Sequence, residues 1–158
     1  MSRKHAIRKI CFTASSGGHM EEISQLYEIS EQYDSFLFTE KEKFLESNFC
    51  DKIIYVPQMN RHEKTFFIKM IRLFFISARV LHREKPDCII STGALVTYPI
   101  CLLGKLTGRK IIYIESFARV ESCSLTGKLM KPIADLYIVQ WEELKEQVPN
   151  AIYGGGIF

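Results

Sequence analysis

The stretch ICFTASSGGH, residues 10–19, decides the fold. Its first five residues form an apolar run typical of a buried strand, and a helical pattern begins at Met20. A strand, a short glycine-containing loop and a helix form the first unit of an open α/β fold, whose ligands bind at the carboxyl ends of the strands. The loop is not G-x-G-x-x-G and no Gly-Lys-Ser/Thr follows it, which excludes the dinucleotide fingerprint and the P-loop.

Apolar runs that fit strands alternate with helical patterns along the rest of the chain. The runs cover residues 7–14, 35–39, 52–56, 87–92, 110–115 and 136–140, and the helical patterns cover residues 21–33, 41–49, 65–84, 97–107 and 125–132. This alternation predicts an α/β fold, a Rossmann-like parallel sheet with helices on both faces. The 158 residues fit a single domain spanning residues 1–158.

The charge of the chain is concentrated in one segment. The whole chain carries a net charge of +3, whereas residues 61–85 contain seven Lys or Arg and two acidic residues. Because the excess of positive charge is confined to this segment, we expect a local anionic partner and no nucleic acid.

The cysteines and the N-terminus indicate the compartment. Five widely spaced cysteines without C-x-x-C predict neither a disulfide framework nor a metal site, and no cofactor is expected. The apolar run after the basic N-terminus is interrupted by Arg8 and Lys9, which does not fit a signal peptide. We therefore expect a cytoplasmic protein.

The glycine loop is the first candidate site. Gly17 and Gly18 allow the backbone to approach an anion such as a phosphate closely, and Ser15 and Ser16 add hydroxyl groups. His19 adds a hydrogen-bond donor or a general base. The alternative is a simple strand-to-helix turn in which Ser16 is the N-cap.

A second candidate group follows two other predicted strands. Thr92-Gly93 ends one strand, and Glu115-Ser116 ends the next. A carboxylate at a strand end can hold a sugar hydroxyl or accept its proton, which makes Glu115 a candidate catalytic residue beside His19. The alternatives are a solvated acid at Glu115 and a simple turn at Thr92-Gly93.

The helical pattern of residues 65–84 combines a basic stripe with aromatic bulk. It is too short and too charged to span a bilayer. Such a helix fits the surface of an anionic membrane, and the alternative is an ordinary amphipathic helix packed on the sheet. The residues expected at the membrane surface are Phe67, Lys69, Arg72, Phe74, Phe75 and Arg79.

The last residues combine glycine with apolar side chains. Gly155 and Gly156 precede Ile157 and Phe158, whereas a free tail is normally polar. The apolar residues dock either on this chain or on a partner subunit, and these four residues form the candidate partner interface.

Five segments together resemble one family: Ser15–His19, Ser91–Ala94, Tyr113–Val120, Leu125–Lys128 and Val139–Trp141. They are similar to the membrane-associated subunit of two-subunit glycosyltransferases. One branch contains the anchor subunit of the UDP-N-acetylglucosamine transferase of N-glycan assembly. The other contains bacterial accessory proteins, called β-1,4-galactosyltransferase enhancers, of capsular and exopolysaccharide synthesis. The lack of an N-terminal membrane span resembles the bacterial branch.

The resemblance implies the N-terminal, acceptor-side half of a GT-B glycosyltransferase. A separate small subunit would bind the nucleotide sugar, and the acceptor would be a polyprenyl-diphosphate-linked sugar at the cytoplasmic face of the plasma membrane. In the related single-chain enzyme of peptidoglycan synthesis, a glycine-rich loop ending in histidine is thought to face the acceptor diphosphate. This role carries over to Gly17, Gly18 and His19, although Ser15-Ser16 replace the longer glycine pattern.

The resemblance, together with these residues, implies an acceptor-binding, membrane-recruiting subunit of a UDP-sugar-dependent transferase that is active with a partner chain. Ser15, Ser16, Thr92, Gly93 and Ser116 would join the two loop glycines at the acceptor. Two alternatives are a non-catalytic scaffold that recruits a self-sufficient transferase and a stand-alone nucleotide-binding enzyme.

Overall fold

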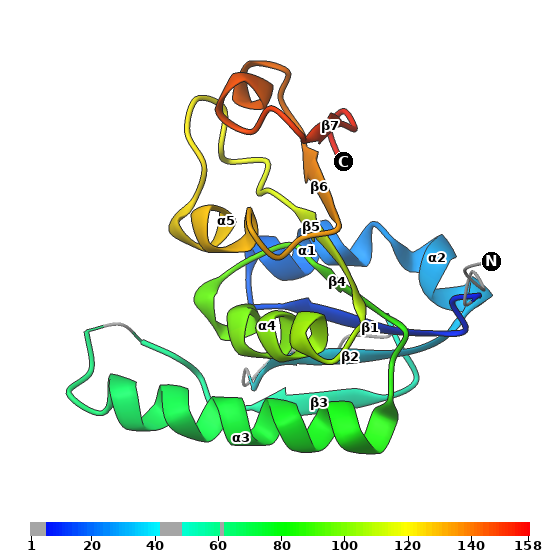
Figure 1. The fold of residues 1–158 in the computed structure, drawn as a ribbon, viewed down its shortest axis with the longest axis vertical. Coiled ribbons are helices and arrows are strands. Elements are labelled where there is room, and N and C mark those ends of the chain that lie inside the picture. Colours follow the sequence, from blue (N-terminus) through cyan, green and yellow to red (C-terminus); the bar gives the residue numbers. More distant parts are fainter. Residues whose placement is uncertain (1–5, 42–48, 61) are drawn as a thin grey trace.

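A parallel sheet organises the molecule, as Figure 1 shows. The computed structural model describes residues 6–41, 49–60 and 62–158, and within them the strand order is β3-β2-β1-β4-β5-β6-β7. Every strand pair is parallel. The strands are β1 (Lys9–Ala14), β2 (Asp34–Glu40), β3 (Ile53–Val56), β4 (Cys88–Ser91), β5 (Lys110–Ile114), β6 (Leu136–Val139) and β7 (Ile152–Tyr153).

Helices cover both faces of this sheet. They are α1 (Gly18–Ser24), α2 (Tyr27–Gln32), α3 (Phe66–Glu84), α4 (Tyr98–Leu106) and α5 (Leu125–Met130), with 3₁₀ helices η1 (Leu95–Thr97) and η2 (Glu143–Gln147). Alternate strand residues point to opposite faces, so each strand contributes to two cores. Phe36 and Phe38 pack in the core that includes Leu73 of α3, whereas Phe12 packs in the core that includes Ile23 of α1. The predicted α/β, Rossmann-like class is confirmed.

The expected helix over residues 21–33 is two helices. A break separates α1 from α2 at Gln25-Leu26. The Ser24 hydroxyl donates a hydrogen bond to the Met20 carbonyl at 2.7 Å, a back-bond that bends helices. The helix expected over residues 41–49 falls largely on residues 42–48, which lie outside the described residues.

The C-terminal segment contains elements that the sequence pattern did not predict. The 3₁₀ helix η2 follows β6, and β7 then pairs with β6 through Ile138↔Ile152 and Val139↔Tyr153. Two residues are too short a run to show strand alternation, and both Ile152 and Tyr153 are exposed.

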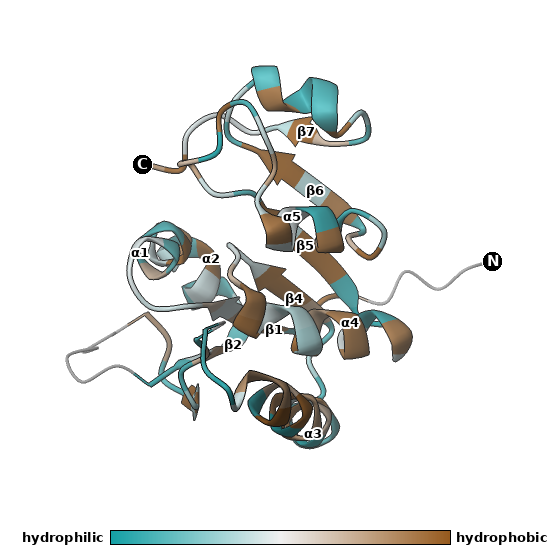
Figure 2. Cartoon of the chain, turned by 90° about the vertical axis from the view of Figure 1, so that its left-hand side faces the viewer, coloured by the Kyte–Doolittle hydropathy of each residue, from teal (hydrophilic) through white to brown (hydrophobic). Residues whose placement is uncertain are grey.

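The strand register brings the candidate loops together. Thr13 of β1 is level with Ser91 of β4, and Ser91 is level with Tyr113 of β5. The loops that follow β1, β4 and β5 therefore emerge side by side at one edge, called here the carboxyl edge. Figure 2 views the molecule from this edge, with α1 on one side of the sheet and α5 on the other.

Candidate functional site at the carboxyl edge

The glycine loop is open to solvent. A Cβ built on Gly17 or Gly18 meets no heavy atom within 4 Å, and Gly17 has a φ of 75°. Gly17 is the N-cap of α1 and no side chain caps this helix, so the alternative role of Ser16 as N-cap is not observed. The Ser15 hydroxyl donates to the Ser16 carbonyl at 3.3 Å. The loop therefore presents glycine backbone to whatever binds at this edge.

The loop after β4 holds His19 in place. The Thr92 hydroxyl donates a hydrogen bond to the His19 carbonyl at 2.7 Å. A Cβ on Gly93 would lie 3.0 Å from Cε1 and 3.2 Å from Nδ1 of His19, so only glycine accommodates the imidazole here without displacement. Gly93 has a φ of 122° and Ala94 a φ of 69°, which is strained for a residue with a side chain. Such strain is common at functional sites.

Glu22, which sequence reasoning missed, connects α1 with the loop after β5. Its Oε1 accepts hydrogen bonds from the Ser116 hydroxyl and the Phe117 N–H, both at 2.9 Å. Its Oε2 lies 4.0 Å from Nδ1 of His19, and both atoms are buried without a hydrogen-bond partner. The i, i+3 spacing of His19 and Glu22 on a helix was the available signal.

Glu115 lies inside the protein, and its side chain is fully buried. Oε1 accepts hydrogen bonds from the Ser116 N–H at 3.1 Å and the Tyr113 hydroxyl at 3.3 Å. Oε2 accepts from the Tyr137 hydroxyl at 2.7 Å and the Ser124 N–H at 3.2 Å. The predicted catalytic position of Glu115, open to a sugar hydroxyl, is therefore not observed. The alternative prediction of a solvated acid is not observed either, because the side chain is buried.

The two tyrosines remain hydrogen-bond donors at neutral pH. Burial raises the pKa of Tyr113 well above its ordinary value, and the charge of Glu115 adds to the effect. Burial and the same carboxylate also raise the pKa of Tyr137. Gly127 of α5 closes this cluster, because a Cβ there would lie 1.8 Å from Oε2 of Glu115 and 2.5 Å from the Tyr137 hydroxyl.

The C-terminal residues dock on their own chain beside this network. The Ile157 N–H donates to Oε1 of Gln140 at 2.8 Å, and Nε2 of Gln140 donates to the Glu115 carbonyl at 3.0 Å. The Phe158 ring meets the Phe117 ring edge-on at 5.6 Å, yet Phe158 is 66% exposed. Gly156 also lies against Phe117, and Gly155 has a φ of 76°.

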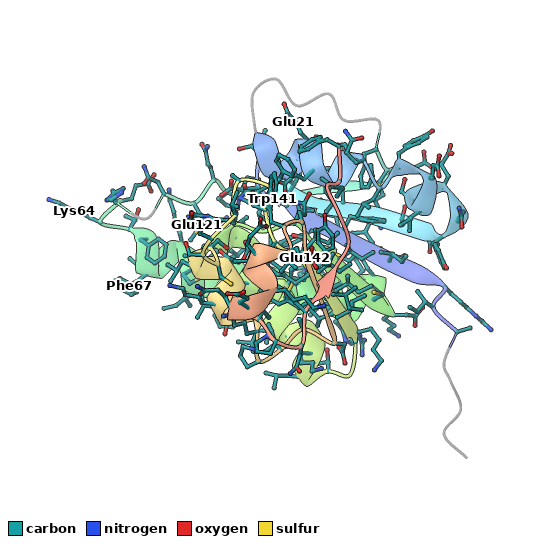
Figure 3. The ribbon with its side chains drawn as sticks, turned by 90° about the horizontal axis from the view of Figure 1, so that it is seen from above. Glu21, Lys64, Phe67, Glu121, Trp141 and Glu142 are labelled. Atoms are coloured by element: carbon teal, nitrogen blue, oxygen red, sulfur yellow. The ribbon has the colours of Figure 1, made fainter. Side chains whose placement is uncertain are left out.

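Trp141, labelled in Figure 3, completes the contacts of Phe117. Its Nε1–H donates to the Phe117 carbonyl at 2.7 Å, and the two rings lie 4.9 Å apart. The loop after β5 is therefore held by Glu22 on one side and by Trp141 on the other.

Helix α3 exposes a large apolar surface. None of the helices in the described ranges combines the length and the hydrophobicity needed to cross a bilayer. Figure 3 shows Lys64 and Phe67 projecting from the beginning of α3, away from the rest of the molecule. The exposed apolar surface of α3 consists of Phe67, Ile68, Ile71 and Phe75, which are 59–76% exposed.

The residues predicted for the membrane surface separate into two groups. Phe67, Arg72, Phe75 and Arg79 are exposed. Phe74 is half-buried, and Lys69 is half-buried and ion-paired with Glu63. Ile68 and Ile71, which were not predicted at this surface, are exposed as well.

A hollow of about 160 Å³ connects the glycine loop with α3. Ser15 and Ala94 line it from the two loops of the site, and Phe66 lines it from the first turn of α3. Because α3 joins the carboxyl end of β3 to the amino end of β4, its N-terminal end lies at the same edge as the site.

This architecture is a Rossmann-like fold, and it matches domains of known glycosyltransferase and epimerase structures. The structure of MurG from Acinetobacter baumannii matches with a TM-score of 0.69 and 16% identity. The match covers 84% of this chain and 41% of that one. At this identity the likeness shows the fold alone.

The family model described as "Oligosaccharide biosynthesis protein Alg14 like" matches residues 10–157, and the chain belongs to this family. A human relative, "UDP-N-acetylglucosamine transferase subunit ALG14", is 42% identical over 89 residues, which are 52% of this chain and 41% of the relative. The protein of the same name in Yarrowia lipolytica is 27% identical over 177 aligned residues, covering 96% of this chain and 82% of the relative. The chain thus spans less than half the length of the human relative it matches.

Proposed function

We propose that this chain is the acceptor-binding and membrane-recruiting subunit of a UDP-sugar-dependent glycosyltransferase in polysaccharide biosynthesis. The acceptor is a saccharide linked to polyprenyl diphosphate, and a small partner subunit binds the donor. The relatives are named as subunits of a UDP-N-acetylglucosamine transferase, so UDP-N-acetylglucosamine is the first donor to test. A bacterial capsule or exopolysaccharide is the proposed context.

One observation carries the proposal: the hollow between Ser15, Ala94 and Phe66 lies between the open glycine loop and the apolar beginning of α3. A polyprenyl-diphosphate acceptor has an anionic head next to a lipid chain. A site for the head that adjoins an apolar surface fits this molecule, because both parts are then accommodated at one edge.

Different loops contact the diphosphate and the sugar of the acceptor. Ser15, Ser16, Gly17 and Gly18 approach the diphosphate, since the glycines are open and present no side chains. Thr92, Gly93 and Ser116 surround the sugar side. The acceptor hydroxyl oxygen bonds to the anomeric carbon of the donor sugar, the bond from that carbon to UDP breaks, and the hydroxyl proton passes to His19. UDP leaves as the anion.

Glu115 has a positioning role in this scheme. A general base must lie within hydrogen-bond distance of the proton it removes, and this carboxylate is fully buried and accepts four hydrogen bonds. It holds the loop that carries Ser116. The Glu115→Ala variant is therefore expected to lose activity together with stability.

The exposed apolar surface of α3 is the proposed contact with the cytoplasmic face of the plasma membrane. Aromatic and aliphatic side chains enter the interface, while Arg72 and Arg79 contact anionic lipid head groups. Sedimentation with anionic vesicles tests this, and the Phe67→Ser, Phe75→Ser double variant is expected to bind at least tenfold more weakly. Leu106→Ser is the matched control, because Leu106 is 73% exposed on another helix.

The donor-binding partner is proposed to dock beside β7 and the C-terminal residues. Ile157 is held by Gln140, whereas Phe158, Ile152 and Tyr153 remain exposed. The side chain of Phe158 thereby contacts both its own chain and the partner. Phe158→Ala is expected to weaken co-purification of the two subunits.

The decisive experiment mixes this chain, the donor-binding partner, a UDP-sugar and a lipid-linked acceptor. Product formation that requires both chains supports the proposal, and no product under any donor contradicts it. Substitutions at Gly17 and His19 distinguish an acceptor-binding subunit from a non-catalytic scaffold. A scaffold tolerates Gly17→Val and His19→Ala in the transferase assay, whereas an acceptor site does not.

A further inference from the structure

We propose that Glu22 is a positioning residue that fixes the tautomer of His19 and thereby its role. The inference rests on the proposed function for its consequence in catalysis. Its structural part, which concerns two side chains of this chain, can be measured without any substrate.

The geometry of the pair has an unusual feature. Oε2 of Glu22 and Nδ1 of His19 are both shielded from solvent, and neither has a hydrogen-bond partner. Buried polar groups normally have a hydrogen-bond partner, so each of these two unpaired atoms is unfavourable as it stands. They lie 4.0 Å apart, about 1 Å beyond hydrogen-bond distance. Contacts of this kind are often long in a free enzyme and shorten when the ligand binds.

The other oxygen of Glu22 fixes the position of the carboxylate. Oε1 accepts hydrogen bonds from the Ser116 hydroxyl and the Phe117 N–H, so rotation of the carboxylate is restrained. Among the described residues no Lys or Arg is ion-paired with Glu22, and the ionisable side chain near its Oε2 is that of His19. The free oxygen is therefore an acceptor directed at the imidazole.

The imidazole is packed against the loop after β4. Gly93 lies against its Cε1 and Nδ1 atoms. The His19 side chain is 28% exposed although Nδ1 is buried, so solvent meets the ring on its remaining side. When Nδ1 carries the proton and donates it to Glu22, Nε2 has a free lone pair. His19 then accepts a hydrogen bond from an acceptor hydroxyl instead of donating one to a phosphate.

The Glu22→Gln variant reverses this arrangement with little change in shape. The amide oxygen can still accept from Ser116 and Phe117, while the amide NH₂ faces Nδ1 and requires a lone pair there. The proton must then move to Nε2. Glu21→Gln is the matched control, because Glu21 is the exposed neighbour on the same helix and loses the same charge (Figure 3).

Nitrogen-15 NMR of the full chain at about pH 9, where imidazole is ordinarily neutral, reports the tautomer directly. The wild type and Glu21→Gln are expected to show the Nδ1–H form, and Glu22→Gln the Nε2–H form. In the assay with the partner subunit, Glu22→Gln is expected to lower kcat on the order of a hundredfold with little change in KM for the acceptor.

Several outcomes overturn the proposal. An Nε2–H tautomer in the wild type does so even if the variant fails to fold. An unchanged tautomer in Glu22→Gln, or a changed tautomer with wild-type kcat, does so as well. A wild-type complex that makes no product contradicts the proposed function instead, and the NMR result still decides whether Glu22 controls His19.

Discussion

Buried carboxylates are stabilised in different ways at the two edges of the sheet. At the amino edge, Glu84 is ion-paired with two lysines and an arginine. At the carboxyl edge, Glu22 and Glu115 accept hydrogen bonds from hydroxyl and backbone N–H groups. No Lys or Arg in the described ranges is ion-paired with either of these two.

This difference shows what each edge is built for. Flexible lysines compensate a buried charge without fixing its direction, which is sufficient for stability. Hydroxyl and amide donors have defined directions, so they fix the loops that carry Ser116 and His19. The carboxyl edge therefore uses hydrogen bonds from neutral donors where the positions of functional groups matter, and the substitutions below test each edge separately.

The largest expected effect comes from Gly127→Ala at the carboxyl edge. The added Cβ would overlap Oε2 of Glu115 and the Tyr137 hydroxyl, and neither can move without breaking a buried hydrogen bond. Overpacking and a lost buried hydrogen bond together are expected to lower the free energy of unfolding by about 3–5 kcal/mol. Denaturation by urea measures this change.

Gly18→Ala is the control for that substitution. A Cβ on Gly18 meets no heavy atom within 4 Å, and the residue lies in a helix, where alanine is favoured over glycine. Its free energy of unfolding should stay within about 1 kcal/mol of the wild type. Equal destabilisation by both substitutions would show that the cluster around Glu115 is not the tightly packed element described here.

The fold could be predicted from the sequence because its strands are nearly continuous apolar runs. ICFTA, residues 10–14, and the run that ends in Ser91 lie in neighbouring buried strands, where hydrophobicity alone reveals the element. The break at Gln25-Leu26 and strand β7 were missed for physical reasons. The first depends on one serine back-bond, and the second has two exposed residues.

The candidate site was predicted only in outline. The strand ends correctly indicated that the loops containing His19, Gly93 and Ser116 meet, because right-handed crossovers place the carboxyl ends of parallel strands at one edge. The burial of Glu115 depends on tyrosines 113 and 137 from two strands, which is a tertiary property that local sequence does not contain. Glu22 was overlooked because its sequence position is that of an ordinary polar residue on a helix. Its contacts come from residues 116 and 117, which are distant in sequence.

A smaller effect is expected from Tyr137→Phe. The substitution removes the hydroxyl that donates to Glu115 at 2.7 Å and leaves a buried carboxylate with one donor fewer. We expect the free energy of unfolding to fall by about 2 kcal/mol, the usual range for a hydrogen bond to a charged group. Tyr153→Phe, at an exposed position, should change it by less than about 0.5 kcal/mol. Similar values for the two tyrosines would contradict a structural role of the Glu115 cluster.

The smallest effect concerns the amino edge and depends on pH. The hydrogen bond from Lys52, followed by those from Arg83 and Lys9, lowers the pKa of Glu84 from 4.5 to about 2. A depressed carboxyl pKa stabilises the fold above pH 4.5, and this stabilisation is lost as pH falls from 4.5 towards 2.

Because the Lys52 and Arg83 side chains are 48% and 61% exposed, solvent screening reduces the contribution to about 1–2 kcal/mol. Unfolding measured at pH 7 and at pH 3 should show this loss in the wild type. In Glu84→Gln the neutral amide cannot titrate, so that part of the pH dependence should disappear and the stability at pH 7 should be lower. An acid dependence that is the same in both proteins would mean that the ion pairs at the amino edge contribute nothing beyond burial, and the contrast between the two edges would then rest on the carboxyl edge alone.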